Sequence, residues 1–315
     1  MNNIYNQLAN PFTALAPLDD VSDVVFREII SGCAKPDLFF TEFVNVDGLQ
    51  SIGREKLLHK LWKTDTDNPI IAQLWGKNPE NYHIVTQELI DMGFAGIDIN
   101  MGCPDKAVIK NGCCIALINN RELAKDIIDA TRSGAGNKLP ISVKTRLGFN
   151  EIDLTWPEFL LNQKLDALFI HGRTKKEMSL VPAHWETINA IRVMRDQIDP
   201  STKIIGNGDV KNRAAALEYA KKYKLDGIMI GRGVFEDPYA FSVNSNWTNF
   251  SRQQKIDLFK KHINLFLNTY KHHERSQNVM KRFCKMYLNN FPGAKELRDT
   301  VMTQKTLADV LTILR

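Results

Sequence analysis

The sequence GIDINMGCP, residues 96–104, decides how this chain folds. Its first half, around Ile97 and Ile99, is β-branched and predicts a short buried strand. The strand stops at Asn100, a glycine, Cys103 and a proline. Such an ending delivers an amide and a thiol together at the carboxyl end of the strand. We therefore expect a functional site there, with the rest of the chain organised around it.

Other short apolar segments repeat this pattern, and amphipathic segments separate them. The predicted strands lie at 13–17, 38–43, 70–74, 96–100, 141–146, 167–171, 203–207 and 227–231. The predicted helices lie at 21–31, 79–92, 121–133, 184–197 and 212–222. Eight buried strands that alternate with helices predict an α/β protein with a (β/α)8 TIM barrel. An open doubly wound sheet is the alternative, but Gly206-Asn207-Gly208 lacks the third glycine of its dinucleotide fingerprint.

Strand patterns end after residue 233, and from about residue 250 only helical patterns remain. The longest predicted helix is 253–270, followed by 279–289 and two shorter ones. The sequence therefore predicts a catalytic barrel domain at 1–242 and a smaller all-helical domain at 243–315.

The composition is that of a soluble globular protein, with 315 residues, 43% hydrophobic residues and a net charge of +5. No apolar run approaches the roughly 18 residues of a membrane span. The first ten residues lack the basic and apolar regions of a secretory leader. The five cysteines have no framework spacing, which suits free thiols in a reducing compartment. We therefore predict a cytoplasmic protein with no membrane partner.

The charge is unevenly distributed along the chain. From residue 241 onward there are 13 lysines and arginines against 5 acidic residues, a net charge of +8. The preceding part of the chain has a net charge of −3. This asymmetry is typical of a polyanion partner, although a solvated basic helical surface gives the same count.

In TIM barrels, functional residues concentrate at the carboxyl ends of the strands. Most of the eight predicted strand ends here carry amide, basic or imidazole groups. The polar residues at the strand ends are Asp19, Glu42, Gln73, Asn100, Lys144, Arg146, His171, Arg173, Thr174, Asn207, Asp209 and Arg232. A purely structural barrel needs none of these groups on its rim, so the sequence predicts a ligand at this end.

The last two strand ends indicate the kind of ligand. Gly208, Gly231 and Arg232 follow the seventh and eighth strands, where barrels commonly bind phosphate, although glycines in tight turns would look the same. Gln73 and Lys144 could hydrogen-bond a flat, electron-rich heterocycle. A phosphate and a flat ring near a lysine suggest FMN. Pyridoxal phosphate is the alternative, and the lysine would then form a Schiff base.

Cys103 has three possible roles. An ordinary thiol is mostly protonated at neutral pH, so Cys103 could act as a general acid beside a flavin. It could also be a nucleophile activated by His171, or an inert buried thiol. The flanking glycine and proline favour an exposed loop. Cys113 and Cys114 are adjacent, do not match zinc spacings and are interpreted as small apolar fillers, so we predict no metal site.

At this point the sequence resembles the tRNA-dihydrouridine synthases, FMN-dependent barrel enzymes that reduce uridines of tRNA. The likeness runs in order from about residue 12 to residue 310. The matching motifs are APLD (16–19), TEF (41–43), AQLWG (72–76), DINMGCP (98–104), SVKTRLG (142–148), HGRT (171–174), NGDV (207–210), MIGRG (229–233) and FPGAKELR (291–298).

The resemblance implies a role for each matching residue. Cys103 would be the general acid that protonates C5 of the uracil while a hydride from reduced FMN reaches C6, and NADPH would reduce the FMN first. Asn100 and Arg146 would hold the flipped base. The residues expected around FMN are Pro17, Leu18, Asp19, Gln73, Lys144, His171, Asn207, Gly208, Asp209, Gly231 and Arg232. The other expected contacts to the tRNA, at its D-loop and elbow, are Arg173, Lys281, Arg282 and Lys285. Family members are generally monomers.

The chain departs from the family pattern at three places: the segment 113–115, the segment 178–180, and His184 before Trp185. These departures affect the expected base contacts and the choice of uridine. Two alternatives remain, an FMN barrel that reduces a small enoate or dihydropyrimidine, and a non-catalytic RNA-binding barrel. The basic helical region argues against the first, and Cys103 with Lys144 and His171 argues against the second.

Overall fold

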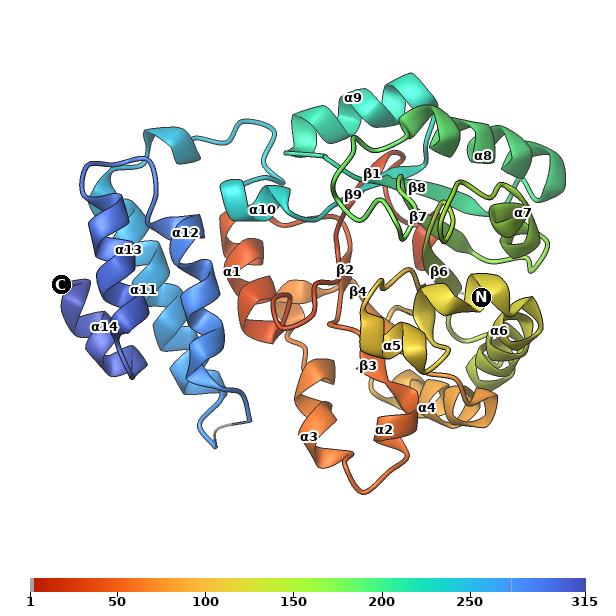
Figure 1. Cartoon of the computed structure of the whole chain (residues 1–315), viewed down its shortest axis with the longest axis horizontal. Helices are drawn as coiled ribbons and strands as arrows, with labels where there is room; N and C mark the ends of the chain where they lie inside the picture. Colours follow the sequence, from red (N-terminus) through yellow and green to blue (C-terminus); the bar gives the residue numbers. More distant parts are fainter. Residues whose placement is uncertain (1–2, 273) are drawn as a thin grey trace.

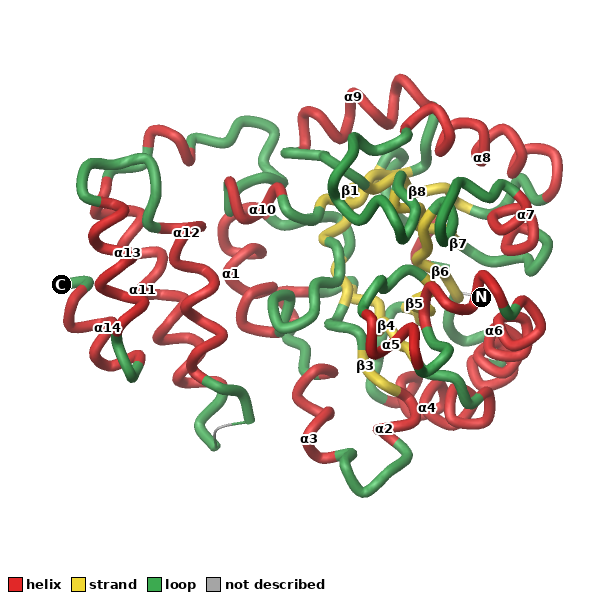
Figure 2. The backbone as a smooth tube through the Cα atoms, in the orientation of Figure 1, coloured by secondary structure: helices red, strands yellow, loops and turns green. Residues whose placement is uncertain are grey.

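The computed structural model describes residues 3–272 and 274–315. Its largest feature is a parallel sheet curled into a barrel, on the right of Figure 1 and yellow in Figure 2, with helices around it. The strands are β1 (Phe12–Leu15), β2 (Phe39–Phe40), β3 (Val44–Asn45), β4 (Ile70–Trp75), β5 (Gly96–Met101), β6 (Ile141–Arg146), β7 (Ala167–His171), β8 (Lys203–Asn207) and β9 (Gly227–Ile230).

The strand order confirms the predicted (β/α)8 TIM barrel. In space the strands follow the order β1-β9-β8-β7-β6-β5-β4-β2, and β3 also pairs with β4. An isolated parallel bridge between Ala14 and Leu38 connects the two ends of this path. All the carboxyl ends of the strands therefore meet at one rim of the barrel.

The second predicted strand, 38–43, is wrong in its extent. It is replaced by β2 and β3, which contain two residues each and both pair with β4. Between them the Thr41 hydroxyl accepts the main-chain N–H of Gln73 at 3.0 Å. A side-chain oxygen thus takes the place of a ladder carbonyl, so the chain can leave the sheet before Val44 returns to it.

The predicted helices around the barrel are present, within a few residues of their expected limits. The structure has α1 (Val24–Ala34), α2 (Val46–Leu49), α3 (Glu55–Leu58), α4 (Pro79–Asp91), α5 (Lys106–Lys110), α6 (Arg121–Ala135), α7 (Thr155–Leu161), α8 (Trp185–Ile198), α9 (Arg213–Tyr223) and α10 (Gly233–Glu236). The sequence prediction missed α7, which has seven residues, no side-chain cap and Pro157 in its first turn. Among the described residues, no helix is long and apolar enough to cross a membrane.

The barrel interior is apolar toward the amino ends of the strands and polar at their carboxyl ends. Residues two apart in a strand face the same side of the sheet. On β7, Phe169 packs against the ring of Tyr5 inside the barrel, and His171 follows it two residues later. On β8, Ile205 is followed in the same way by Asn207. The polar groups at the strand ends therefore lie directly above a packed hydrophobic layer inside the barrel.

The helical region lies beside the barrel, on the left of Figure 1. It contains α11 (Arg252–Thr269), α12 (Cys284–Tyr287), α13 (Ala294–Thr303) and α14 (Leu307–Ile313), with the 3-10 helices η5 (Trp247–Asn249) and η6 (Gln277–Phe283). The predicted α-helix at 279–289 is wrong, because η6 and the single turn of α12 replace it. The three-residue turn of η6 places Met280 and Phe283 on one buried side. The boundary between residues 242 and 243 stays a prediction.

A buried ion pair connects the helical region to the barrel rim. The Nη1 atom of Arg275, which precedes η6, lies 2.5 Å from Oε2 of Glu42 and 3.6 Å from Oδ2 of Asp23. Glu42 also accepts the main-chain N–H of Asp20 at 2.6 Å. Burial raises the pKa of both Glu42 and Asp23, and the charge of Arg275 opposes this rise. Arg275 therefore stabilises two carboxylates that would otherwise be unpaired inside the protein.

Replacing Arg275 with methionine tests this connection. The change removes the cation that pairs directly with Glu42 and Asp23, and we expect the free energy of unfolding near neutral pH to fall by about 3–5 kcal/mol. The loss should shrink toward about pH 5, because burial raises the pKa of both carboxyls and favours their neutral forms in the folded state. Urea unfolding at the two pH values measures both effects. Arg282→Met is the control, because it removes an exposed pair with Asp20 worth less than about 1 kcal/mol. Equal losses in the two variants would contradict the role of Arg275.

Candidate active site

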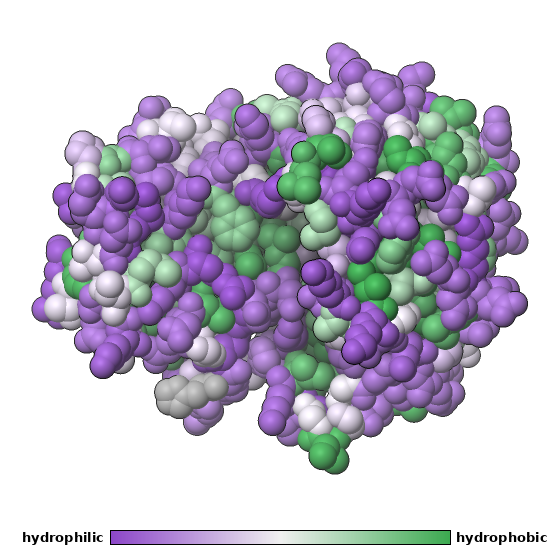
Figure 3. All heavy atoms as spheres, in the orientation of Figure 1, coloured by the Kyte–Doolittle hydropathy of each residue, from purple (hydrophilic) through white to green (hydrophobic). Residues whose placement is uncertain are grey.

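A pocket of about 830 Å³ opens at the carboxyl ends of the strands. Figure 3 shows the surface hollowed between the barrel and the helical region, with hydrophobic residues in the recess and hydrophilic residues around it. The predicted tRNA contacts Lys281, Arg282 and Lys285 do not line the pocket, because they lie on the helical region. The other predicted site residues all line it: Pro17, Leu18, Asp19, Gln73, Asn100, Cys103, Lys144, Arg146, His171, Arg173, Asn207, Gly208, Asp209, Gly231 and Arg232.

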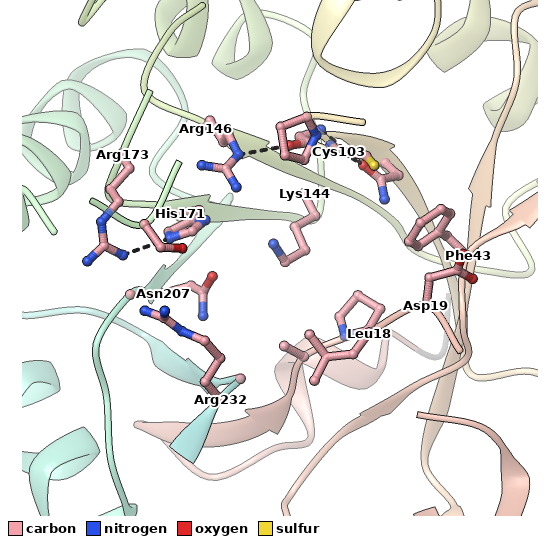
Figure 4. Close-up of a pocket in the computed structure, with 18 of the residues that line it drawn as sticks. Leu18, Asp19, Phe43, Cys103, Lys144, Arg146, His171, Arg173, Asn207 and Arg232 are labelled. Atoms are coloured by element: carbon pink, nitrogen blue, oxygen red, sulfur yellow. Dashed lines mark hydrogen bonds between the residues drawn. The ribbon is translucent and has the colours of Figure 1, made fainter. Parts of the chain in front are cut away.

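The pocket has two chemically different ends (Figure 4). Cys103 and Phe43 lie at one end, and Arg173 and Arg232 lie at the other. Lys144 points its amino group into the space between them. A ligand that fills the pocket would therefore meet a thiol and an aromatic ring at one end and guanidinium groups at the other.

Glycines bring the segments after β7, β8 and β9 close together at the arginine end. Gly208 has a φ of +133°, and a Cβ there would lie 2.7 Å from Cβ of Ala183. A Cβ on Gly233 would lie 2.3 Å from the carbonyl oxygen of Lys211. Neither position can accept a side chain without a shift of its neighbours. The main chain itself therefore lines this end of the pocket, at Gly208, Gly231 and Gly233.

Two arginines share one carboxylate at this end. Asp209 pairs with Nη2 of Arg173 and, at 3.1 Å, with Nη2 of Arg232. Arg173 was predicted to contact the substrate, but its side chain is 2% exposed and lies beside His171, away from Cys103 (Figure 4). Two guanidinium groups against one carboxylate leave a net positive charge, which suits an anion such as a phosphate.

Burial sets the charges of the two central basic residues. It lowers the pKa of Lys144 to about 8, so the ammonium form still predominates at neutral pH. Burial and, to a smaller extent, the cations Arg146 and Lys144 together lower the pKa of His171 to about 2. His171 is therefore neutral, and its Nε2 lies 3.1 Å from Nη1 of Arg173. An imidazole with so low a pKa is a weak base, and Arg173 already contacts its Nε2, so the structure does not support the alternative in which His171 activates Cys103 as a nucleophile.

The sulfur of Cys103 contacts two hydrogen-bonding groups. The Cys114 thiol is hydrogen-bonded to it, and the main-chain N–H of Asp105 donates to it. The bond with Cys114 lowers the pKa of Cys103 to about 7, although burial acts in the opposite direction. The Cys103 thiol therefore gives up its proton more readily than an ordinary cysteine.

Cys113 and Cys114 are buried and pack with Val108 against Trp75 and Cys103, as expected of apolar fillers. Nothing in the sequence indicated the second role of Cys114 as a hydrogen-bond partner of Cys103. Cys114 adopts a left-handed φ of +54°, which is uncommon for a residue with a side chain. Its contact with Cys103 depends on how the loop folds back, and spacing alone does not predict this.

A chain of side-chain hydrogen bonds holds the loop that carries Cys103. Asn100 Oδ1 accepts the main-chain N–H groups of Gly102 and Cys103, both at 3.0 Å. Asn100 Nδ2 donates to Gln73 Oε1 at 3.0 Å, and Gln73 Nε2 donates to Asp98 Oδ2 at 2.7 Å. Asp98 was not predicted as a site residue, although its position two residues before Asn100 on the same strand places both side chains on the same face of the sheet.

Arg146 supports the same loop from β6. Its Nε donates to the carbonyl of Gly102 at 2.9 Å, and its Nη1 donates to the carbonyls of Thr174 and Met178 at 3.2 and 3.3 Å. Burial lowers the pKa of Arg146 to about 10, so it stays charged. It thus joins the loop after β5 to the loop after β7.

Two aromatic residues complete the thiol end of the pocket. Phe43 and Trp75 line it, and their rings meet edge to face with centroids 6.3 Å apart. Neither was predicted as a site residue. Both lie at the carboxyl end of a predicted strand, where functional residues of TIM barrels concentrate. The prediction considered only polar residues at these ends and therefore omitted the two aromatic rings.

Three carboxylates meet at the edge of the pocket. Oxygens of Asp19, Asp20 and Glu42 lie within 4.8 Å of one another, close enough to hold a metal ion. Lys60 pairs with Asp19, and Arg275 pairs with Asp20 and Glu42. The protein's own cations therefore offset this negative charge, and the cluster gives no reason to assign a metal.

Solved structures share the barrel fold. Morphinone reductase matches 75% of this chain and 86% of its own with a TM-score of 0.53 and 13% identity. Histamine dehydrogenase from Rhizobium sp. 4-9 matches 82% of this chain and 49% of its own with a TM-score of 0.55 and 12% identity. At such identities the likeness concerns the fold alone, and it agrees with a TIM barrel.

Curated relatives are far more similar in sequence. A probable tRNA-dihydrouridine synthase of Staphylococcus aureus (strain Mu50 / ATCC 700699) is 41% identical over 315 residues, which cover 99% of this chain and 94% of the relative. Probable tRNA-dihydrouridine synthase 2 of Bacillus subtilis (strain 168) is 40% identical over 316 residues, with 99% and 95% coverage. The family model described as dihydrouridine synthase matches residues 14–315. Because the match runs through both the barrel and the helical region, the chain belongs to the dihydrouridine synthase family.

Proposed function

We propose that this protein is a tRNA-dihydrouridine synthase that uses FMN and NADPH to reduce the C5=C6 bond of a D-loop uridine in tRNA to 5,6-dihydrouridine. One observation carries the proposal: the Cys103 thiol and the Lys144 amino group share a pocket whose far end carries Arg173 and Arg232 (Figure 4). Membership in the dihydrouridine synthase family supports the same reaction.

The pocket fits FMN at its arginine end and along its middle. The main chain at Gly208 and Gly231, together with Arg232, offers donors for a phosphate. Lys144 would place a positive charge beside the ring, where it favours the negative charge of the reduced form. The pocket volume of about 830 Å³ lies within the usual range for cofactor sites. When bound and reduced by NADPH, FMN supplies the hydride.

Cys103 is the proposed proton donor. The C4 carbonyl of uracil polarises the C5=C6 bond, so the hydride reaches C6 and the proton reaches C5. Cys103 gives this proton, and the thiolate left behind accepts hydrogen bonds from the Cys114 thiol and the Asp105 N–H. These contacts make the proton easier to give than that of an ordinary cysteine, whose pKa is about 8.5.

Asn100 and Arg146 are proposed to hold the flipped base. One Nδ2 hydrogen of Asn100 goes to Gln73, and its Oδ1 already accepts two main-chain N–H groups. Asn100 can therefore donate its second Nδ2 hydrogen to a uracil carbonyl, whereas accepting from the ring N–H would cost it an existing bond. Arg146 adds a charged donor at the same end of the pocket.

A uridine within folded tRNA must leave its stack to enter such a pocket. The helical region, with its net charge of +8, supplies cations for the phosphate backbone. Arg282 donates to the main-chain carbonyl of Asp20 at 3.0 Å, next to the pocket residue Asp19, so this basic surface adjoins the pocket. We therefore assign 1–242 as the catalytic domain and 243–315 as the tRNA-binding domain.

The proposal includes a monomeric enzyme in the cytoplasm, as the family resemblance implies. A small-molecule flavin reductase is the second candidate, favoured only by the barrel fold it would share. A small-molecule substrate would not need the basic helical region, whereas a tRNA substrate would bind to it through its phosphates.

The function is tested with tRNA from cells that lack this gene. We expect the purified protein to take up FMN and, with NADPH, to form dihydrouridine in that tRNA. Cys103→Ala should keep FMN and tRNA binding but reduce uridine at least about 100-fold more slowly, because the proton donor is gone. Mass spectrometry of digested tRNA measures the product. A protein that takes up no FMN would refute the cofactor, and an unchanged Cys103→Ala rate would exclude the general-acid role.

Cys114→Ala tests what lowers the pKa of Cys103. The variant removes the thiol hydrogen bond, so the pKa of Cys103 should rise from about 7 toward its ordinary value of about 8.5. The pH midpoint of iodoacetamide labelling, resolved for the Cys103 peptide by mass spectrometry, measures this shift. Cys284→Ala changes a buried thiol of the helical region and is the control. An unmoved midpoint in Cys114→Ala would contradict the assigned hydrogen bond.

Neutralising the predicted tRNA contacts tests the RNA surface. We expect weaker tRNA binding, with a log–log salt slope smaller by about 1 for each lost phosphate contact. Filter binding at several salt concentrations measures affinity and slope. The variant combines Lys281→Gln, Arg282→Gln and Lys285→Gln. The control combines three exposed residues of the barrel helices, Lys125→Gln, Lys221→Gln and Lys222→Gln. Equal affinities of the two variants would place the RNA surface elsewhere.

A further inference from the structure

Asp98 is a buried carboxylate that the proposed chemistry does not use. It is fully buried inside the barrel on β5, in register with Gln73 on β4 and Ser142 on β6. Its Oδ1 accepts from the Ser142 hydroxyl at 2.5 Å, and its Oδ2 accepts from Gln73 Nε2 at 2.7 Å. Burying a carboxylate is costly, and an apolar side chain would fill this layer of the barrel more cheaply.

The Asp98 carboxylate determines how the side-chain amides of Gln73 and Asn100 are oriented. An ionised carboxylate only accepts hydrogen bonds, so Gln73 must turn its NH2 group toward Asp98. Gln73 Oε1 then faces Asn100 and accepts from its Nδ2 at 3.0 Å. This fixes Asn100 Oδ1 toward the main chain, where it accepts the N–H groups of Gly102 and Cys103. If Gln73 were reversed, two NH2 groups would face each other and the loop would lose its acceptor.

We propose that Asp98 is a positioning residue for the reaction: through Gln73 and Asn100 it holds the main chain of Cys103 where the thiol can give its proton. The proton-transfer part of this inference rests on the proposed function. The placement of the Cys103 sulfur does not, because it concerns only this chain.

Protonation of Asp98 should keep this arrangement. Burial raises the pKa of Asp98 to about 6, although its two hydrogen bonds and the charge of Lys144 act in the opposite direction. Below this pH the carboxyl carries an O–H, which can donate to the Ser142 oxygen while the other oxygen still accepts from Gln73. The titratable groups around it are Lys144 on β6, Tyr5 on η1 (Ile4–Asn6) and Tyr82 on α4. The pKa of Lys144 is about 8 and burial raises those of both tyrosines, so Asp98 alone of this set titrates near pH 6.

Two substitutions of Asp98 distinguish the effect of its hydrogen-bond acceptor from the effect of its negative charge. Asp98→Ala removes the acceptor, whereas Asp98→Asn keeps a carbonyl for Gln73 and can turn its NH2 group to the Ser142 oxygen. The first readout is iodoacetamide labelling of Cys103 in the FMN-loaded protein, which needs no substrate. We expect labelling near pH 7 to be about fivefold slower in Asp98→Ala, as a rise of one unit in the pKa of Cys103 would give. Asp98→Asn should label at the wild-type rate.

The second readout is the pH profile of single-turnover uridine reduction. A protonated Asp98 still offers Gln73 an acceptor, as Asp98→Asn does, so the wild-type protein and Asp98→Asn should have the same pH profile through about pH 6. Asp98→Ala should be about tenfold slower or more at neutral pH.

Asp166→Ala is the matched control. Asp166 is a half-buried carboxylate at the other end of the barrel, where it accepts from Asn3 Nδ2 at 2.6 Å and from the Ile141 N–H at 2.7 Å. Its loss should change neither readout. Unchanged labelling in a folded Asp98→Ala protein overturns the proposal, and so does an equal slowing in Asp98→Asn. If Asp98→Ala does not fold, slower labelling of Cys103 in Asp98→Asn than in the wild-type protein overturns it alone.

The two proposals can fail separately. If labelling behaves as expected but tRNA is not reduced, the positioning role of Asp98 stands and the proposed function falls. If tRNA is reduced but labelling does not respond to Asp98→Ala, the proposed function stands and the positioning role falls.

Discussion

Two hydrogen bonds to one side-chain oxygen hold the loop around which the pocket is built. Asn100 Oδ1 accepts the main-chain N–H groups of Gly102 and Cys103, so the chain turns as soon as β5 ends. The turn sets the sulfur at the rim instead of leaving it on a long loop. Lys144 is the register partner of Asn100 on the neighbouring strand, so the thiol and the amino group are placed by one pair of residues. The sheet fixes the positions of the Cys103 thiol and the Lys144 amino group, because both residues lie in a strand or within three residues of one.

Charge in the pocket is arranged by burial as much as by residue type. His171 lies among several cations, and burial keeps its imidazole neutral. Lys144 is buried as well but has a much higher ordinary pKa, so it remains mostly charged. At the arginine end, Asp209 offsets one of two guanidinium groups. The result is a positive pocket that does not also carry an imidazolium, which suits an anionic cofactor and avoids excess repulsion among Lys144, Arg173 and Arg232.

The sequence predicted those features that depend on strand periodicity. Buried strands of period two, each ending in polar residues, were enough to predict the barrel and most of the polar residues that line its mouth, because all parallel strands end at one rim. Features that depend on contacts between distant segments were missed. The Cys114–Cys103 contact requires a loop to fold back, and the Arg275–Glu42 pair joins residues far apart in the chain. Arg173 follows a strand end as expected, but its rotamer takes it to the arginine end, and no spacing rule specifies a rotamer.

The buried pair between Arg275 and Glu42 connects the proposed RNA surface to the chemistry. Glu42 also accepts the N–H of Asp20, and the adjoining Asp19 lines the pocket. The helical region is therefore anchored to a loop of the pocket itself. A buried ion pair adds little net stability, but one with fixed partners allows few alternative arrangements. A substrate held by the helical region would thus meet the Cys103 thiol at a distance set by rigid contacts, and selection of one uridine in a folded RNA requires such a fixed distance.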